Sequence, residues 1–259
     1  MKNRLQSLFE KKDHNLLSVY FTAGFPHIDS TVPVIKALAE GGVDMIEVGV
    51  PFSDPMADGP VIQQSSTEAL RNGMNLSLLL DQVAEARQEV KETPLVLMGY
   101  LNVMMQYGIE RLFKRCREVG IDALIVPDLP FKDYLSDFQN LCREYDLPII
   151  MLITPETSDE RIKLIDEHCD GFIYMVSAAS TTGTRDKFDD AQLDYFKRIS
   201  RLPLRHNRLI GFGISNPGTL REAWTYSSGA IIGSLFIKCL AATSTPAEAV
   251  SKLLAALRD

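Results

Sequence analysis

Short apolar runs rich in β-branched residues alternate with amphipathic stretches along the chain. This alternation is typical of a parallel sheet whose strands are joined by crossover helices. Eight runs have the length and composition of buried strands, and they cover residues 17–22, 44–50, 95–100, 123–126, 149–153, 171–176, 209–212 and 230–232. The segments between these runs are predicted to be helical, so the pattern indicates eight strand–helix units.

Several of the intervening segments carry specific helix signals. The segment after residue 108 places apolar residues at i, i+3, i+4 and i+7, namely Ile109, Leu112, Phe113 and Cys116. That spacing produces an apolar stripe that can lie on a sheet, and Gly120 follows where a helix often ends. Thr157 and Glu160 have the spacing of a capping box, which predicts a helix start. The same spacing recurs at Thr245 and Glu248, with a proline between them at the first helical position.

The number of units decides between two architectures. No linker rich in Pro, Gly or Ser and no shift in composition divides the chain, so residues 1–259 are expected to form a single domain. Eight strand–helix units in 259 residues match the size of a closed (β/α)8 barrel. An open doubly wound sheet is the alternative, but such a sheet usually has fewer strands. We therefore expect an α/β protein with a (β/α)8 TIM barrel and an extra N-terminal helix.

Composition and charge exclude several classes of function. The net charge of −7 comes from acidic residues scattered along the chain, without a Lys/Arg cluster, which argues against nucleic acid as a partner. The four cysteines lie far apart, with no CxxC pair and no histidine at metal-ligand spacing, so we predict reduced core thiols and no metal. Neither a secretory signal nor an apolar run of membrane-spanning length occurs, and a cytoplasmic location without membrane attachment is predicted.

One strand carries a carboxylate that a purely structural role does not explain. In the run 44–50, period-two alternation places Ile46 and Val48 on one face, and Met45 and Glu47 on the other. The branched face should meet the helices, so Glu47 points into the barrel near the C-terminal end of its strand, where barrel enzymes place catalytic groups. The alternative is an ion pair with a buried Lys or Arg, but the expected strand interiors contain neither. Burial would raise the pKa of Glu47 towards the range useful for acid–base catalysis.

The loop after this strand carries two further carboxylates, Asp54 and Asp58. Both could form Asx turns or cap the helix that begins near Pro60. Asp58 is nevertheless the better functional candidate, because its loop lies over the barrel mouth and follows the strand that holds Glu47. A carboxylate from the strand and one from the loop could then flank a ligand.

Three turns after late strands are suited to anion binding. They contain Thr182-Gly183, Gly211 with Gly213, and Gly233-Ser234. Glycine lets backbone N–H groups approach a ligand closely, and barrels commonly build phosphate sites from the loops after strands seven and eight with a short helix N-terminus. Gly233-Ser234 ahead of residues 235–240 fits that arrangement, although tight turns also need glycine for backbone reasons alone.

The run from Glu47 to Pro60, EVGVPFSDPMADGP, closely resembles the signature of tryptophan synthase α subunits. Other stretches are similar in order and spacing, and they are YFTAG at 20–24, MGYLN at 98–102, PDLP at 127–130, TG at 182–183, GFGIS at 211–215 and GS at 233–234. The resemblance therefore covers nearly the whole chain.

The resemblance implies a lyase that cleaves indole-3-glycerol phosphate to indole and glyceraldehyde 3-phosphate in tryptophan biosynthesis. It places Glu47 and Asp58 in the two catalytic positions. It also implies that the backbone of Gly183, Gly213, Gly233 and Ser234 binds the phosphate, and that Tyr20, Tyr100 and Tyr174 line the indole end. Thr182 and Gly211 are further substrate-binding candidates. Tyrosines at strand ends are also common as core residues with the hydroxyl at the surface.

The resemblance further implies a β-subunit partner in an α2β2 heterotetramer. Pyridoxal phosphate would belong to that partner, and no cofactor is expected in this chain. A stand-alone indole-releasing lyase and a catalytically weak regulatory barrel are the alternatives. An indole-glycerol-phosphate synthase would instead need a lysine at a strand end, whereas Lys36, Lys91 and Lys163 all fall in segments predicted to be helical.

Overall fold

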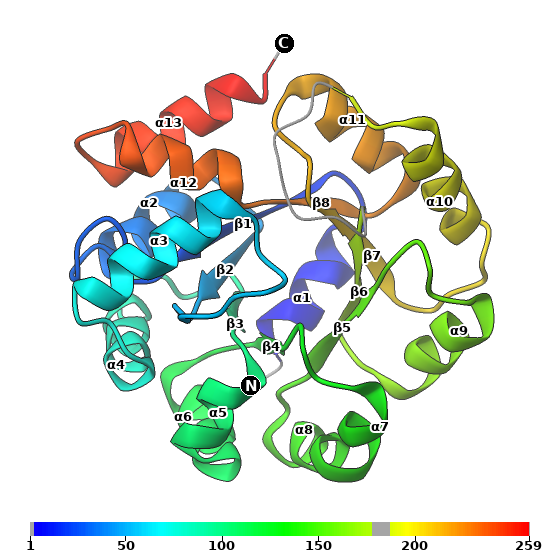
Figure 1. The fold of residues 1–259 in the computed structure, drawn as a ribbon, viewed down its shortest axis with the longest axis horizontal. Helices are drawn as coiled ribbons and strands as arrows, with labels where there is room; N and C mark the ends of the chain where they lie inside the picture. The colour runs from blue at the N-terminus through cyan, green and yellow to red at the C-terminus, as the bar shows by residue number, and fades with distance from the viewer. Residues whose placement is uncertain (1–2, 178–186, 259) are drawn as a thin grey trace.

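The strands hydrogen-bond in chain order into a closed barrel, and every neighbouring pair is parallel (Figure 1). The computed structural model describes residues 3–177 and 187–258. The strands are β1 (Leu16–Thr22), β2 (Met45–Gly49), β3 (Leu95–Met98), β4 (Ala123–Ile125), β5 (Ile149–Ile153), β6 (Phe172–Val176), β7 (Asn207–Gly211) and β8 (Gly229–Ile232). The predicted (β/α)8 barrel is confirmed, and the open sheet is wrong.

The helices lie around the outside of the barrel, except for α1 (Arg4–Lys11), which is seen inside the ring of strands (Figure 1). They are α1 (Arg4–Lys11), α2 (Thr31–Glu40), α3 (Pro60–Arg71), α4 (Leu76–Ala86), α5 (Leu101–Tyr107), α6 (Ile109–Val119), α7 (Phe131–Asp133), the π-helix η1 (Tyr134–Phe138), α8 (Gln139–Tyr145), α9 (Asp159–His168), α10 (Asp190–Ser200), α11 (Pro217–Tyr226), α12 (Ser234–Ala241) and α13 (Pro246–Ala256). Within the described ranges, none of the helices is both long and apolar enough to cross a membrane.

The helix signals were correct at two positions and displaced by one residue at a third. Helix α6 ends at Gly120, which adopts a left-handed conformation with φ 87°, and the Thr245 hydroxyl caps α13 as predicted. Helix α9 is capped by Ser158 rather than by Thr157. The Thr157 hydroxyl instead accepts a hydrogen bond from the Thr154 backbone N–H at 2.9 Å, so the turn before the helix occupies it.

Two predictions about basic residues are wrong. Strand β7 begins two residues before the predicted run and therefore includes Arg208. Its side chain shares the parity of Ile210, which packs in the layer between sheet and helices, so Arg208 faces away from the barrel interior. Lys91 lies in the loop between α4 and β3, at the N-terminal end of the strand, whereas Lys36 and Lys163 are helical as predicted.

The N-terminal helix α1 packs against the interior of the barrel. Leu5 is 1% exposed and belongs to the same apolar cluster as the inward-facing residues of the strands. Phe9 adds an edge-to-face contact with Phe172 of β6, with ring centroids 6.0 Å apart. Burial of this apolar face, rather than helix propensity, accounts for an eight-residue helix being stable here.

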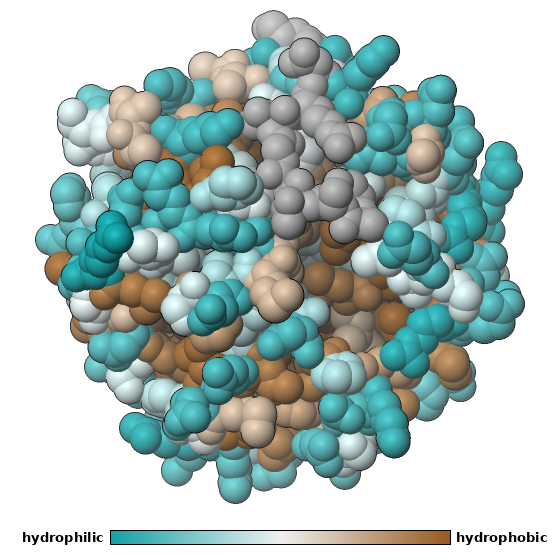
Figure 2. All heavy atoms as spheres, in the orientation of Figure 1, coloured by the Kyte–Doolittle hydropathy of each residue, from teal (hydrophilic) through white to brown (hydrophobic). Residues whose placement is uncertain are grey.

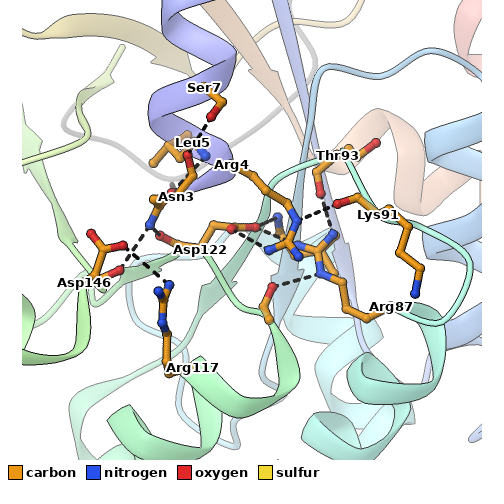
Figure 3. Close-up of polar contacts among 12 residues, drawn as sticks. Asn3, Arg4, Leu5, Ser7, Arg87, Lys91, Thr93, Arg117, Asp122 and Asp146 are labelled. Atoms are coloured by element: carbon orange, nitrogen blue, oxygen red, sulfur yellow. Dashed lines mark hydrogen bonds and ion pairs between the residues drawn. The ribbon is translucent and has the colours of Figure 1, made fainter. Parts of the chain in front are cut away.

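A buried ion-pair network ties α1 to the chain around it (Figure 3). The Asp122 carboxylate, just before β4, accepts hydrogen bonds from Arg87 at 2.6 Å and from Arg4 at 3.0 Å. It also accepts from the Leu95 backbone N–H at 2.9 Å. Asn3 caps α1 and donates to the Asp122 carbonyl at 2.9 Å. The remaining guanidinium donors of Arg87 bond to the carbonyl groups of Gly120, Val90 and Thr93.

We expect Arg87→Ala to lower the free energy of unfolding by roughly 3–5 kcal/mol, because it removes one partner of a buried ion pair. Arg87 and Asp122 are only 7% and 2% exposed. Arg117→Ala is the matched control, since its pair with Asp146 is long, at 3.5 Å, and both side chains are more than 40% exposed. That control should change stability by about 1 kcal/mol or less in urea unfolding. Equal losses in the two variants would contradict the assigned role of Arg87.

Candidate active site

Glu47 projects into the barrel from the middle of β2, as the strand alternation predicted. Its side chain is completely buried, and its Oε1 atom accepts a hydrogen bond from the Ser18 hydroxyl at 2.8 Å. Its Oε2 atom has no hydrogen-bond partner among the described residues. Burial raises the pKa of Glu47 to about 7, and the Ser18 hydrogen bond offsets only part of that rise. Near neutral pH this carboxyl can therefore either donate or accept a proton.

Asp58 is the second buried carboxyl at the mouth, with 4% of its surface exposed. The Tyr100 hydroxyl donates to its Oδ2 atom at 2.9 Å, while burial raises its pKa to about 6. The N-cap of α3 is Gly59, and no side chain caps that helix, so the capping alternative for Asp58 is wrong. Asp54 is exposed and accepts a hydrogen bond from its neighbour Ser53. The two carboxylates of this loop therefore differ in burial, since Asp58 is buried at the mouth and Asp54 is exposed.

Two of the three candidate tyrosines face the same pocket as the carboxyls. Tyr20 and Tyr174 are 6% and 4% exposed and line it together with Glu47 and Asp58. Each ring lies against a glycine of a neighbouring strand. A Cβ atom on Gly49 would come within 2.2 Å of the Tyr20 hydroxyl, and a Cβ on Gly211 within 2.2 Å of the Tyr174 hydroxyl. These glycines are required because any side chain would occupy the space of a tyrosine.

Tyr100 has a different position from the other tyrosines. Its hydroxyl accepts a hydrogen bond from the Ala57 backbone N–H at 3.0 Å while donating to Asp58, and its ring stacks on Phe52 at 5.1 Å. Tyr100 therefore holds the loop after β2 over the mouth. It is absent from the pocket lining within the part of the chain that the structure describes.

The glycine turns after β7 and β8 also contribute to the pocket lining. Gly213, Gly233 and Ser234 line it, and α12 begins at Ser234 with Gly233 as its N-cap. The first N–H groups of a helix have no partner within the helix, and its dipole favours an anion there. Gly211 lies within β7 behind Tyr174 and is not a lining residue in the described ranges. Thr182 and Gly183 lie outside the described residues.

Other lining residues were missed from the sequence. The pocket walls include apolar side chains, namely Ile62, Met98, Phe212, Ile214, Ile231 and Leu235. Their identities match ordinary core residues, so no sequence signal separated them from the core. Ser18, which is not a lining residue but bonds to Glu47, was also missed. It could have been found, because it is a polar residue in an apolar run and shares the inward parity of Tyr20. Figure 2 shows apolar side chains gathered near the centre and lower part of one face, inside a mostly hydrophilic rim.

Taken together, the fold and the pocket are typical of a (β/α)8-barrel enzyme, and the candidate acid–base site lies at the C-terminal mouth. Two buried carboxyls with raised pKa values face an apolar pocket and a helix N-terminus. Within residues 3–177 and 187–258, no group of three or more His, Cys, Asp and Glu residues could hold a metal ion.

Comparison with known proteins gives the family. Residues 6–259 match the family model described as tryptophan synthase alpha chain, and the chain belongs to that family. It is 55% identical to the tryptophan synthase alpha chain of Parabacteroides distasonis, over 99% of this chain and 100% of that one. The Bacteroides fragilis relative of the same name is 53% identical over 98% and 97% of the two chains. The crystal structure of tryptophan synthase subunit alpha from Legionella pneumophila superposes with a TM-score of 0.88 at 31% identity, covering 99% and 97%.

Proposed function

We propose that this chain is the lyase subunit that cleaves indole-3-glycerol phosphate to indole and glyceraldehyde 3-phosphate in tryptophan biosynthesis. Family membership supports this activity, and the chemistry of the pocket suits it. The observation that carries the proposal is the Glu47 side chain, which lines a largely apolar pocket, has an Oε2 atom without a partner among the described residues, and has a pKa of about 7.

Glu47 is the proposed proton carrier. The reaction adds a proton to indole C3 and removes the proton of the C3′ hydroxyl. The bond between C3 and C3′ then breaks, its electron pair returns to the indole ring, and C3′ becomes the aldehyde carbon of the second product. One carboxyl can donate the first proton and accept the second, so Glu47 ends the cycle in the state in which it began.

Asp58 is the proposed electrostatic partner. Protonation of C3 makes the ring a cationic indolenine, and a carboxylate that accepts the indole N–H stabilises this cation more than the neutral substrate. The pKa of Asp58 is about 6, below that of Glu47 at about 7. At neutral pH the mouth can therefore hold an ionised Asp58 and a partly protonated Glu47, which is the combination the reaction requires.

The ends of the substrate have separate proposed sites. The N-terminus of α12, with Gly233 and Ser234, and the turn at Gly213 would hold the phosphate. Tyr20 and Tyr174 would flank the indole ring, because both rings line the pocket beside the carboxyls. Burial holds the pKa of each phenol far above its usual value, so both stay neutral and act by shape and hydrogen bonding. Thr182 and Gly183 are proposed to complete the phosphate site on the family resemblance alone.

Family membership also implies a β-subunit partner. We propose an α2β2 assembly in which pyridoxal phosphate belongs to the β subunit and this chain carries no cofactor of its own. A single-domain chain is proposed because strands from residues 16 to 232 form one barrel. The four cysteines are all free and buried, which suits the reducing cytoplasm proposed as its location.

Indole release by the purified chain, with and without a β subunit, tests the proposal. We expect indole from indole-3-glycerol phosphate in both cases, with faster release in the complex. A rate that the β subunit leaves unchanged would favour the stand-alone lyase. Absence of indole in both conditions, with substrate still bound, would favour a regulatory barrel and overturn the proposed activity.

A further inference from the structure

Ser18 lies directly behind Glu47 in the barrel. It is completely buried on β1, and it faces the interior because it shares the parity of Tyr20. In the register of β1 and β2, Ser18 is opposite Met45 and Tyr20 is opposite Glu47. The Ser18 hydroxyl therefore reaches the carboxyl diagonally across the two strands, from the side opposite the mouth.

The two oxygens of Glu47 consequently have different environments. Oε1 accepts the Ser18 hydrogen bond at 2.8 Å, whereas Oε2 has no partner among the described residues and its side chain lines the pocket. Ser18 itself is not among the described lining residues, so a bound substrate would meet Glu47 and not the serine. We propose that Ser18 is a positioning residue that holds Oε1 of Glu47 and leaves Oε2 as the oxygen that exchanges protons with the substrate.

The same hydrogen bond should set the pH at which Glu47 titrates. A hydroxyl that donates to a carboxylate stabilises the charged form, so Ser18 counteracts the rise in the Glu47 pKa caused by burial. The titratable groups that share the described pocket lining with Glu47 are Tyr20 on β1, Tyr174 on β6 and Asp58 on the loop. The two phenols stay neutral at ordinary pH, so Asp58 is the one neighbour of these three whose charge changes in the working range.

The inference rests on the proposed function for its catalytic meaning, but its physical content can be tested without turnover. Infrared titration of the substrate-free protein, with the spectrum of Glu47→Gln subtracted, follows the carboxyl band of Glu47. We expect Ser18→Ala to raise the Glu47 pKa by about one unit, the shift expected for losing a hydrogen bond to a charged group. An unchanged Glu47 titration in Ser18→Ala overturns the proposal, whether or not the wild-type protein releases indole.

The pH profile of kcat/KM for indole release provides the second readout. In Ser18→Ala, the limb that belongs to Glu47 should move to higher pH by about one unit, up to about a tenfold change in rate at a fixed pH on that limb. The direction is the same whether the acid or the base form starts the reaction, because the carboxyl keeps its proton to higher pH. The limb that belongs to Asp58 should remain in place. A uniform fall in rate at every pH would show a structural role only and would overturn the positioning role.

Three further variants separate the hydrogen bond from packing. Ser18→Thr keeps the hydroxyl and should retain the wild-type titration. Ser18→Cys is similar in size with a weak donor, so it should shift the titration as Ser18→Ala does, and it serves if the alanine variant does not fold. Ser65→Ala is the matched control, because this buried serine bonds to Thr22 and the Ile62 carbonyl and has no bond to Glu47. A shift in Ser65→Ala as large as in Ser18→Ala would overturn the inference.

Discussion

Glu47→Gln is expected to reduce indole formation by at least about a thousandfold, within the range that general acid–base catalysis contributes. The amide has the shape of the carboxyl but can neither release a proton to indole C3 nor accept one from the C3′ hydroxyl. Binding of glycerol phosphate, measured by calorimetry, should stay close to wild type because the proposed phosphate site lies on α12 and the β7 turn. Near-normal indole release would overturn the assignment of Glu47.

Although Glu47→Gln should lower activity, it should raise the stability of the fold above neutral pH, and this difference serves as a control for folding. The pKa of Glu47 is about 7 in the folded protein and 4.5 in the unfolded chain, so ionisation favours unfolding as pH rises from 4.5 to 7. Below pH 4.5 both states are protonated and the penalty is absent. Glu47→Gln should therefore raise the unfolding midpoint at pH 8 and leave it nearly unchanged at pH 4. A lower midpoint at pH 8 would show that the loss of activity came from damage to the fold.

Asp58→Asn is expected to reduce indole formation by roughly a hundredfold or more, the cost of removing one preorganised electrostatic contact. The amide cannot supply negative charge to the cationic indolenine. Its NH2 group is a donor, so it cannot accept a hydrogen bond from the indole N–H. Asp54→Asn is the matched control, since it lies in the same loop but is exposed. That control should retain nearly full activity in the same assay. Equal losses in both variants would mean that the carboxylates shape the loop and do not act on the substrate.

The position of Glu47 could be predicted because strand alternation is a local property. The alternation of Met45 and Glu47 with the branched residues Ile46 and Val48 defines the inward face without any knowledge of the other strands. The positions of Gly213, Gly233 and Ser234 at the pocket were predictable for a similar reason, since a barrel places every loop after a strand on one face. The capping residue Ser158 was missed by one position because Thr157 carries the same kind of hydroxyl.

Contacts between distant segments could not be predicted in this way. The Tyr100 hydroxyl reaches Asp58 across 42 residues of sequence, and Ser18 reaches Glu47 across 29. Both bonds depend on the register and tilt of neighbouring strands, which no local pattern encodes. Strand β7 was predicted too short because Asn207 and Arg208 are polar, although backbone pairing with β6 extends through them. The apolar residues of the pocket lining could not be predicted either, because the same residue types fill the core.

The contacts of Tyr20 with Gly49 and of Tyr174 with Gly211 constrain how this enzyme can evolve. Each glycine can gain a side chain only after its aromatic partner has become smaller, because a Cβ atom and the phenol would otherwise be 2.2 Å apart. Mutations at the two members of a pair are thus epistatic, and the order in which they arise matters. In either pair, the tyrosine would have to be replaced by a smaller residue first, and a side chain at the glycine position could be accommodated only afterwards.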